Sequence, residues 1–209
     1  MIAYTRLVGL GALLLAASLC GYAFYELVLY PRAGLPTSDF AVIVAAANTL
    51  RVGHWLKFGY ALSLAMLAVG LYSRMDAQSP ALARLASLAG ASAVVLFLAS
   101  GHLGLRILAV AQATFAGNPA EATATIMLRT VTIALLEAAT FATGCYALLV
   151  NSAALLSGFL PRALAFLGIA LGALYLVNIF LPDSLIVVAP LATIAWSLWL
   201  ALIAWREAR

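Results

Sequence analysis

The chain has 209 residues, of which 66% are hydrophobic and only 9% are charged. A soluble domain is about 45–50% apolar and about 25% charged, so this composition indicates an integral membrane protein and excludes most classes of soluble enzyme. The 11 Lys and Arg residues outnumber the 7 Asp and Glu residues. They lie singly between apolar runs, however, so a nucleic-acid partner is not expected. We expect one transmembrane domain over residues 1–209, surrounded by the lipid bilayer.

Six apolar segments are long enough to cross a membrane, which takes about 20 helical residues. The sequence therefore predicts an all-α bundle with six transmembrane helices, over residues 7–29, 53–72, 82–103, 126–150, 160–181 and 185–205. Residues 38–50 are apolar but too short for a crossing, and they are typical of an interfacial helix or an extension of the next span. The first apolar run is longer than the core of a signal peptide, so we expect it to be a retained span.

Proline, glycine and polar residues separate these segments. Ser38 or Asp39 is placed to cap the helix that follows the first break. The break from Arg106 to Thr125 is the longest, and it is mildly amphipathic. Residues 182–184 (PDS) form so short a connection that the last two spans are predicted to be an antiparallel hairpin.

The positions of the basic residues predict that both termini are cytoplasmic (N-in, C-in). The side with the termini holds six arginines, namely Arg6, Arg74, Arg84, Arg162, Arg206 and Arg209. The other side holds Arg32, Arg51, Lys57, Arg106 and Arg129. The first group lies in the short loops and termini that the positive-inside rule counts, and this decides the orientation.

Polar residues of three spans fall at one depth. A helix rises about 1.5 Å per residue, so Glu26 lies about 30 Å from Arg6, and His54 lies the same distance from Arg74. His102 is about 27 Å from Arg84. Both histidines and Glu26 are therefore predicted near the outer hydrocarbon boundary.

Cationic residues share the helix faces of the two histidines. Arg51, His54 and Lys57 lie on one face of the second span, and His102 and Arg106 lie on one face of the third. On the first span, Tyr22, Glu26 and Tyr30 share a face, and Arg129 begins the fourth span at a similar height. The sequence thus predicts a polar pocket in the outer leaflet, between the first four spans.

Two imidazoles on neighbouring helices are the axial ligands that one b-type haem requires, and Arg51, Lys57 and Arg106 are suited to pair with its propionates. A haem here would need an external redox partner, in the membrane or the periplasm. Alternatively, His54, His102 and Glu26 form the two-histidine, one-carboxylate set of a divalent metal site. Each of these residues also lies near a helix end, where charged side chains commonly serve only as interfacial anchors.

Glu137 is predicted near the midplane, about 18 Å inside the fourth span. An ionisable group at that depth is costly and marks a candidate proton or substrate site, with Arg129 or a polar group of another helix as its partner. Asn178 is a further candidate for the same polar wall. The alternative is a protonated carboxyl group bonded to Thr132 or Thr140.

Three functions remain open on this sequence. The first is a small-ligand or cofactor binder, with one haem b as its most concrete form; the others are a proton-coupled carrier using Glu137 and an accessory or scaffold subunit. The chain contains no phosphate-binding loop, zinc-protease motif, nucleophile elbow or EF-hand. Cys20 and Cys145 lie in apolar runs without metal-site spacing and are expected to be packing residues.

The chain resembles a bacterial family of small multi-span membrane proteins that carry a domain of unknown function. The resemblance lies in residues 4–9 (YTRLVG), in residues 160–168 (LPRALAFLG) and in the end of the last span, around residues 199–206. It covers about a third of the chain. It implies a helical bundle in the inner membrane and says nothing about activity.

Overall fold

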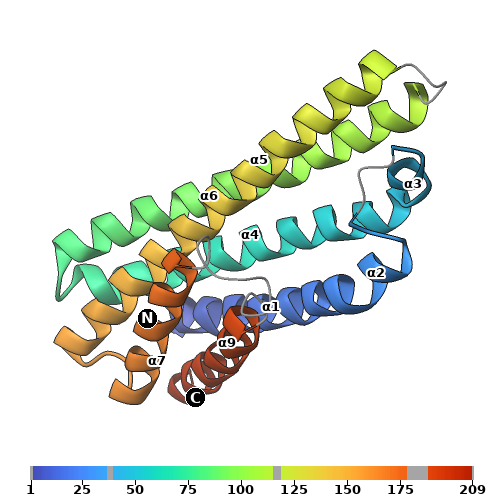
Figure 1. The fold of residues 1–209 in the computed structure, drawn as a ribbon. Helices are drawn as coiled ribbons and strands as arrows, with labels where there is room; N and C mark the ends of the chain where they lie inside the picture. Colours follow the sequence, from blue (N-terminus) through green and yellow to red (C-terminus); the bar gives the residue numbers. More distant parts are fainter. Residues whose placement is uncertain (1, 37–39, 115–118, 178–187, 209) are drawn as a thin grey trace.

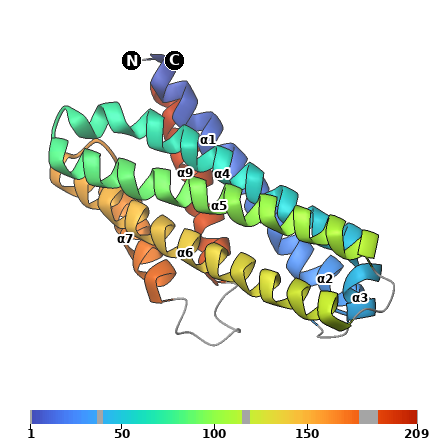
Figure 2. The same ribbon diagram turned by 90° about the horizontal axis from the view of Figure 1, so that it is seen from above.

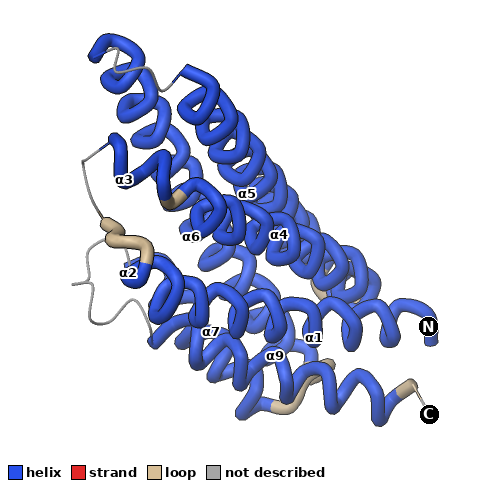
Figure 3. Tube along the Cα trace, turned by 90° about the vertical axis from the view of Figure 1, so that its right-hand side faces the viewer, coloured by secondary structure: helices blue, strands red, loops and turns tan. Residues whose placement is uncertain are grey.

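The computed structural model describes residues 2–36, 40–114, 119–177 and 188–208, and the regular structure within these ranges is helical (Figure 3). The predicted all-α class is confirmed. The elements are α1 (Ile2–Phe24), the π-helical turn η1 (Tyr25–Leu29), α2 (Tyr30–Arg32), α3 (Phe40–Ala45), α4 (Ala47–Asp76), α5 (Pro80–Thr114), α6 (Pro119–Ser157), α7 (Arg162–Val177) and α9 (Val188–Glu207). The predicted cap at Ser38 or Asp39, the turn at 182–184 and Asn178 lie outside the described residues.

Helices that follow one another in the chain also lie side by side. α1 packs on α4, α4 on α5, and α5 on α6, while α7 packs on α6 (Figure 1). α9 returns along α1, so both ends of the chain lie together (Figure 2). There the Arg74 guanidinium of α4 donates to Thr5 Oγ1 at 3.0 Å and forms an ion pair with Glu207 at 2.5 Å.

Within the described residues, five helices are long and apolar enough to span a membrane, namely those within residues 4–32, 47–76, 80–113, 123–157 and 188–207. The described part of the segment predicted as the fifth span, up to residue 177, forms α7, an apolar helix of 16 residues. The chain is therefore a membrane-type helical bundle. Six crossings, the cytoplasmic termini and the bacterial inner membrane stay predictions.

Several helices are longer than the spans predicted from hydropathy. α4 begins at Ala47, so only the part of residues 38–50 that forms α3 remains a separate short helix. α5 continues to Thr114 and α6 starts at Pro119, so most of the break predicted between spans from Arg106 to Thr125 is helical. The physical reason is that arginine and glutamine interrupt an apolar run without ending a helix, because they are good helix formers.

Small residues four apart, Thr140 and Gly144 on α6 and Gly168 and Gly172 on α7, let these two helices approach closely. A methyl group at Gly172 of α7 would lie 2.9 Å from the Gly144 carbonyl oxygen and 2.8 Å from the Leu148 backbone nitrogen, both on α6. Gly90 of α5 plays a similar part, because a methyl group there would lie 3.1 Å from the ring of Tyr146.

Candidate functional site

A cavity of about 200 Å³ lies between α1 with η1, α4, α5 and α6, at the end of the bundle away from the termini. We call it the tyrosine pocket. Its polar or charged lining residues are Tyr22, Tyr25, Glu26, Tyr30, His54, Lys57, Thr125, Arg129 and Thr132. The remaining lining is formed by Ile43, Leu50, Gly53, Gly104, Ile107, Leu108, Ala111, Ile126, Ile133 and Leu136. The predicted polar pocket between the first four spans thus has a counterpart in the fold.

The π-helical turn η1 carries Tyr25 and Glu26 at the edge of the tyrosine pocket. A π-turn inserts one residue into an α-helix and so changes the direction in which the following side chains point; such turns are frequent at functional sites. Tyr25 is buried and its ring lies over Gly53 of α4, where a methyl group would come within 2.6 Å of Tyr25 Cζ. Gly53 therefore makes room for the tyrosine.

Lys57 is a buried cation in this pocket, only 9% exposed. Its Nζ donates to Ser100 Oγ at 2.9 Å, and the Ser100 hydroxyl donates to the Thr132 carbonyl oxygen at 2.9 Å. This chain of hydrogen bonds connects α4, α5 and α6. Because an ammonium group has three N–H donors, the bond to Ser100 leaves others for a ligand.

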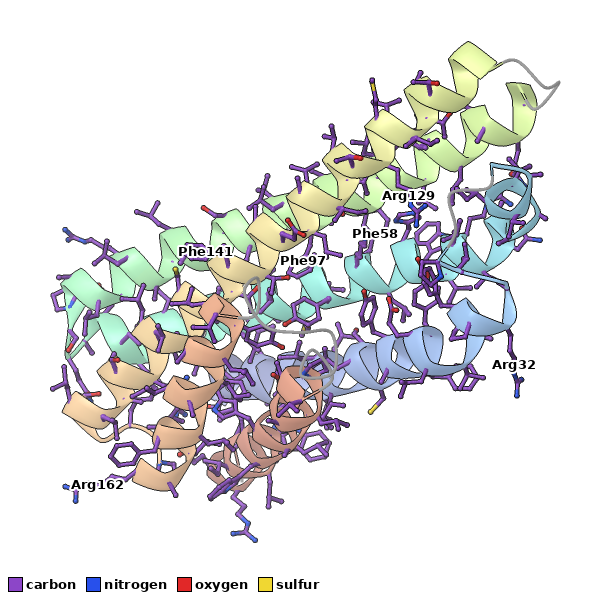
Figure 4. All side chains as sticks on the ribbon, in the orientation of Figure 1. Arg32, Phe58, Phe97, Arg129, Phe141 and Arg162 are labelled. Carbon is purple, nitrogen blue, oxygen red and sulfur yellow. The ribbon has the colours of Figure 1, made fainter. Side chains whose placement is uncertain are left out.

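Arg129 brings a second cation to the pocket from α6. Its guanidinium donates to the Tyr30 hydroxyl of α2 at 3.3 Å. Figure 4 shows that it turns inward, between α6 and α4, whereas Arg32 and Arg162 extend away from the bundle. Among the described lining residues Glu26 is the one carboxylate, so this part of the lining carries two cations, Lys57 and Arg129, against one carboxylate.

The two histidines do not face each other. The ring of His54 lies against the backbone of α5 at Gly104, so closely that a methyl group at Gly104 would overlap it. His102 is two residues from Gly104, a turn of about 200° around the helix, and its side chain is exposed. A haem held by both imidazoles does not fit this arrangement.

The predicted metal site is likewise not assembled. Within the described residues, which include His54, His102 and Glu26, no group of three His, Cys, Asp or Glu side chains is close enough to hold a metal ion. Glu26 and His54 both line the tyrosine pocket, but His102 lies outside it. The correction has a simple cause: equal depth along antiparallel helices does not fix the rotation of each helix about its own axis.

Three other predicted site residues lie outside the pocket lining. Arg51 is hydrogen-bonded to Asn48 at 3.0 Å and also to Gln112, so it connects α4 to α5. Arg106 is exposed. Glu137 is exposed on α6 and is not brought to the cavity with Arg129.

The sequence reasoning missed Ser100, Gly53 and Gly104 as parts of the site. Ser100 and Gly104 are four residues apart and therefore share a face of α5. That face, and not the one of His102, meets His54 and Lys57. The sequence feature that could have identified this face of α5 is the pair of small residues, Ser100 and Gly104, within a run of larger apolar residues.

Removal of the Ser100 hydroxyl tests the chain of hydrogen bonds. In Ser100→Ala, the buried Lys57 ammonium loses its partner, and we expect the free energy of unfolding to fall by about 1–3 kcal/mol. The cost should be smaller when Ser100→Ala is made in a Lys57→Met background, because no buried donor is then left. Unfolding in detergent, followed by circular dichroism, measures both.

Ser92→Ala is the matched control, because Ser92 is exposed on the same helix. Its effect should stay within about 0.5 kcal/mol. Equal costs of Ser100→Ala in the two backgrounds would contradict a bond between Ser100 and Lys57.

One of the comparisons with known proteins identifies the family of this chain. Residues 8–204 match the DUF4386 domain, which is a domain of unknown function. The search of curated proteins and the search of solved structures gave no match. Since the matched region spans nearly the whole chain, this protein belongs to the DUF4386 family.

Proposed function

We propose that this protein is a membrane-embedded binding protein whose tyrosine pocket takes the acidic head of an amphiphile. The observation that carries the proposal is a cavity with apolar walls into which two helices bring Lys57 and Arg129, against the single carboxylate of Glu26. A carboxylate or phosphate head pairs with such cations through charge-assisted hydrogen bonds, which are stronger than neutral ones. The chain of the amphiphile then lies against the isoleucines and leucines of the wall.

The position of the opening supports a ligand that arrives from the bilayer. Ile126 and Ile133 of α6 line the pocket and are themselves 43% and 46% exposed. The pocket therefore opens beside α6, on an apolar surface. Lateral access of this kind suits an amphiphile better than a water-soluble solute, since the latter would have to cross the apolar surface.

The size of the cavity limits what it encloses. Typical small-molecule sites measure about 300–1,000 Å³, and the tyrosine pocket is smaller. It has room for a head group and the first carbons of a chain, while the rest of the chain stays in the bilayer. Both a fatty carboxylate and the phosphate of an anionic lipid meet this description.

Thermal unfolding of the detergent-purified protein with oleic acid tests the proposal. At a concentration 100 times its Kd, a ligand of the folded state adds about 2.7 kcal/mol to the free energy of unfolding. For a chain of this length that raises Tm by about 5–10 °C. Oleyl alcohol, which has the same chain without the charge, should produce no comparable shift. Dioleoyl phosphatidic acid in a parallel series distinguishes a lipid phosphate from a free carboxylate.

Variants test whether the Tm shift with oleic acid arises from binding in the tyrosine pocket. Lys57→Met should abolish the shift because it removes a cation from the pocket, whereas Arg162→Gln, at an arginine that points away from the bundle, should retain it. Ala111→Phe fills the pocket, and Ala109→Phe adds the same ring to an exposed position of the same helix. A shift of equal size in all four variants, or with oleyl alcohol, would overturn the proposal.

A further inference from the structure

A second cavity lies in the other half of the bundle and shares no lining residue with the tyrosine pocket. It measures about 30 Å³ and lies between α1, α4, α6, α7 and α9. Its walls are mostly apolar. Its polar lining includes Tyr146 and Asn151 of α6 and Trp196 of α9, and we call it the Asn151 cavity.

Three buried polar atoms around this cavity have no hydrogen-bond partner within the described structure, namely Tyr146 Oη, Asn151 Oδ1 and Trp196 Nε1. The three side chains are 5%, 0% and 6% exposed. An unpaired buried polar atom costs about 1–3 kcal/mol, and the penalty is larger in a membrane, where no bulk water reaches it. Three such atoms at one small cavity are therefore unlike ordinary packing.

Neighbouring polar groups are already engaged with one another. The hydroxyl groups of Tyr175 and Thr193 are 2.9 Å apart, and Thr193 Oγ1 also donates to the Ala189 carbonyl oxygen at 2.7 Å. Neither of these hydrogen bonds involves any of the three unpaired atoms.

The direction of the Asn151 amide is fixed by its neighbours. Asn151 Nδ2 donates to the Ala147 carbonyl oxygen at 2.7 Å. A carbonyl oxygen can pair only with a donor, so the amide cannot turn over without loss of this bond. On its other side, a methyl group at Gly168 of α7 would overlap the amide, so the side chain has no room to move away. Asn151 Oδ1 therefore stays an acceptor without a partner.

The chemistry of the three atoms matches one water molecule. The indole N–H of Trp196 can only donate, the Tyr146 hydroxyl can donate, and Asn151 Oδ1 can only accept. A water molecule accepts two hydrogen bonds and donates one to this set, which is the usual number of about three for a buried water. About 10–15 Å³ of cavity volume, measured with a water-sized sphere, is enough for one water molecule, so a cavity of about 30 Å³ has room for one.

We propose that the Asn151 cavity is a binding site for ordered water that joins Trp196 of α9 to Tyr146 and Asn151 of α6. The site suits a neutral occupant, because none of the described residues that line it is charged. The water supplies a polar connection between α6 and α9, two helices that otherwise pack on other neighbours, α6 on α5 and α7, and α9 mainly on α1.

Water contacts of the tryptophan indoles test this proposal on the wild-type protein. We would label the four tryptophans with ¹⁵N, place the protein in lipid nanodiscs, and record the transfer of magnetisation from water to each indole proton. Trp196 should show a cross-peak of the sign that a long-lived bound water gives. Trp199 is the matched control: it lies on the same helix, is 40% exposed on the apolar surface, and should show no such peak.

A variant assigns the peak to the cavity. Ala147→Val adds two methyl groups to the lining and should remove the Trp196 peak, whereas Ala170→Val, at an exposed position of α7, should leave it. Helical content from circular dichroism is recorded for both. Absence of a Trp196 peak in the wild-type protein, or an equal peak from Trp199, would overturn the proposal.

Discussion

The Gly172→Ala variant is expected to lose about 1–3 kcal/mol of stability, the usual cost of an overpacked core. The added methyl group would lie 2.8 Å and 2.9 Å from two backbone atoms of α6. Backbone atoms cannot turn aside as a side chain can, so α6 and α7 must move apart. In a membrane such helices associate through close packing, and their separation removes much of the attraction between them. For a chain of this length we expect Tm to fall by about 2–12 °C.

Ala170→Val provides the comparison, because Ala170 is exposed on the same helix. Its added methyl groups face the bilayer, and Tm should change by no more than about 1–2 °C. If both variants unfold at the wild-type temperature, α6 and α7 do not approach each other as closely as described.

Gly104→Ala should instead change binding while it leaves the fold largely intact. The new methyl group would overlap the His54 ring. That ring is the end of a side chain and borders the tyrosine pocket, so it can turn into the cavity. The turned ring takes the place of the ligand head, and we expect oleic acid to bind at least 10-fold more weakly, with most of its Tm shift lost.

Gly101→Ala separates this effect from a change in helix propensity. Gly101 lies one turn earlier on α5, where a methyl group would be 3.2 Å from the His54 carbonyl oxygen and 3.3 Å from the Phe58 ring, so the neighbours need to shift by only a few tenths of an ångström. We expect this variant to keep the shift with oleic acid. A Gly104→Ala variant that unfolds early without ligand would show that His54 cannot move, and an unchanged shift would contradict its place beside the ligand.

The local polarity of the candidate site could be predicted from the sequence. A simple count of residues placed Glu26 and His54 at one depth. Lys57 was placed on the helix face of His54 and Arg129 at a similar height, and the structure brings all four to one cavity. The count works because the rise of a helix is the same for every residue. It also placed His102 at this depth, but His102 is not among the described residues that line the cavity, since a count of residues gives height and not rotation.

The sequence by itself determined that this chain is a bundle of apolar helices and roughly where each helix lies. Hydrophobicity over about 20 residues identifies such helices, because a polypeptide among lipids must pair its backbone N–H and C=O groups with one another. The tertiary structure alone decided which face of each helix turns inward. In a membrane protein the core and the surrounding lipid are both apolar, so leucine and alanine occur on every side and the sequence gives little sign of the buried face. The π-turn that carries Tyr25 and Glu26, the glycines under Tyr25 and His54, and the burial of Asn151 all depend on that choice of face.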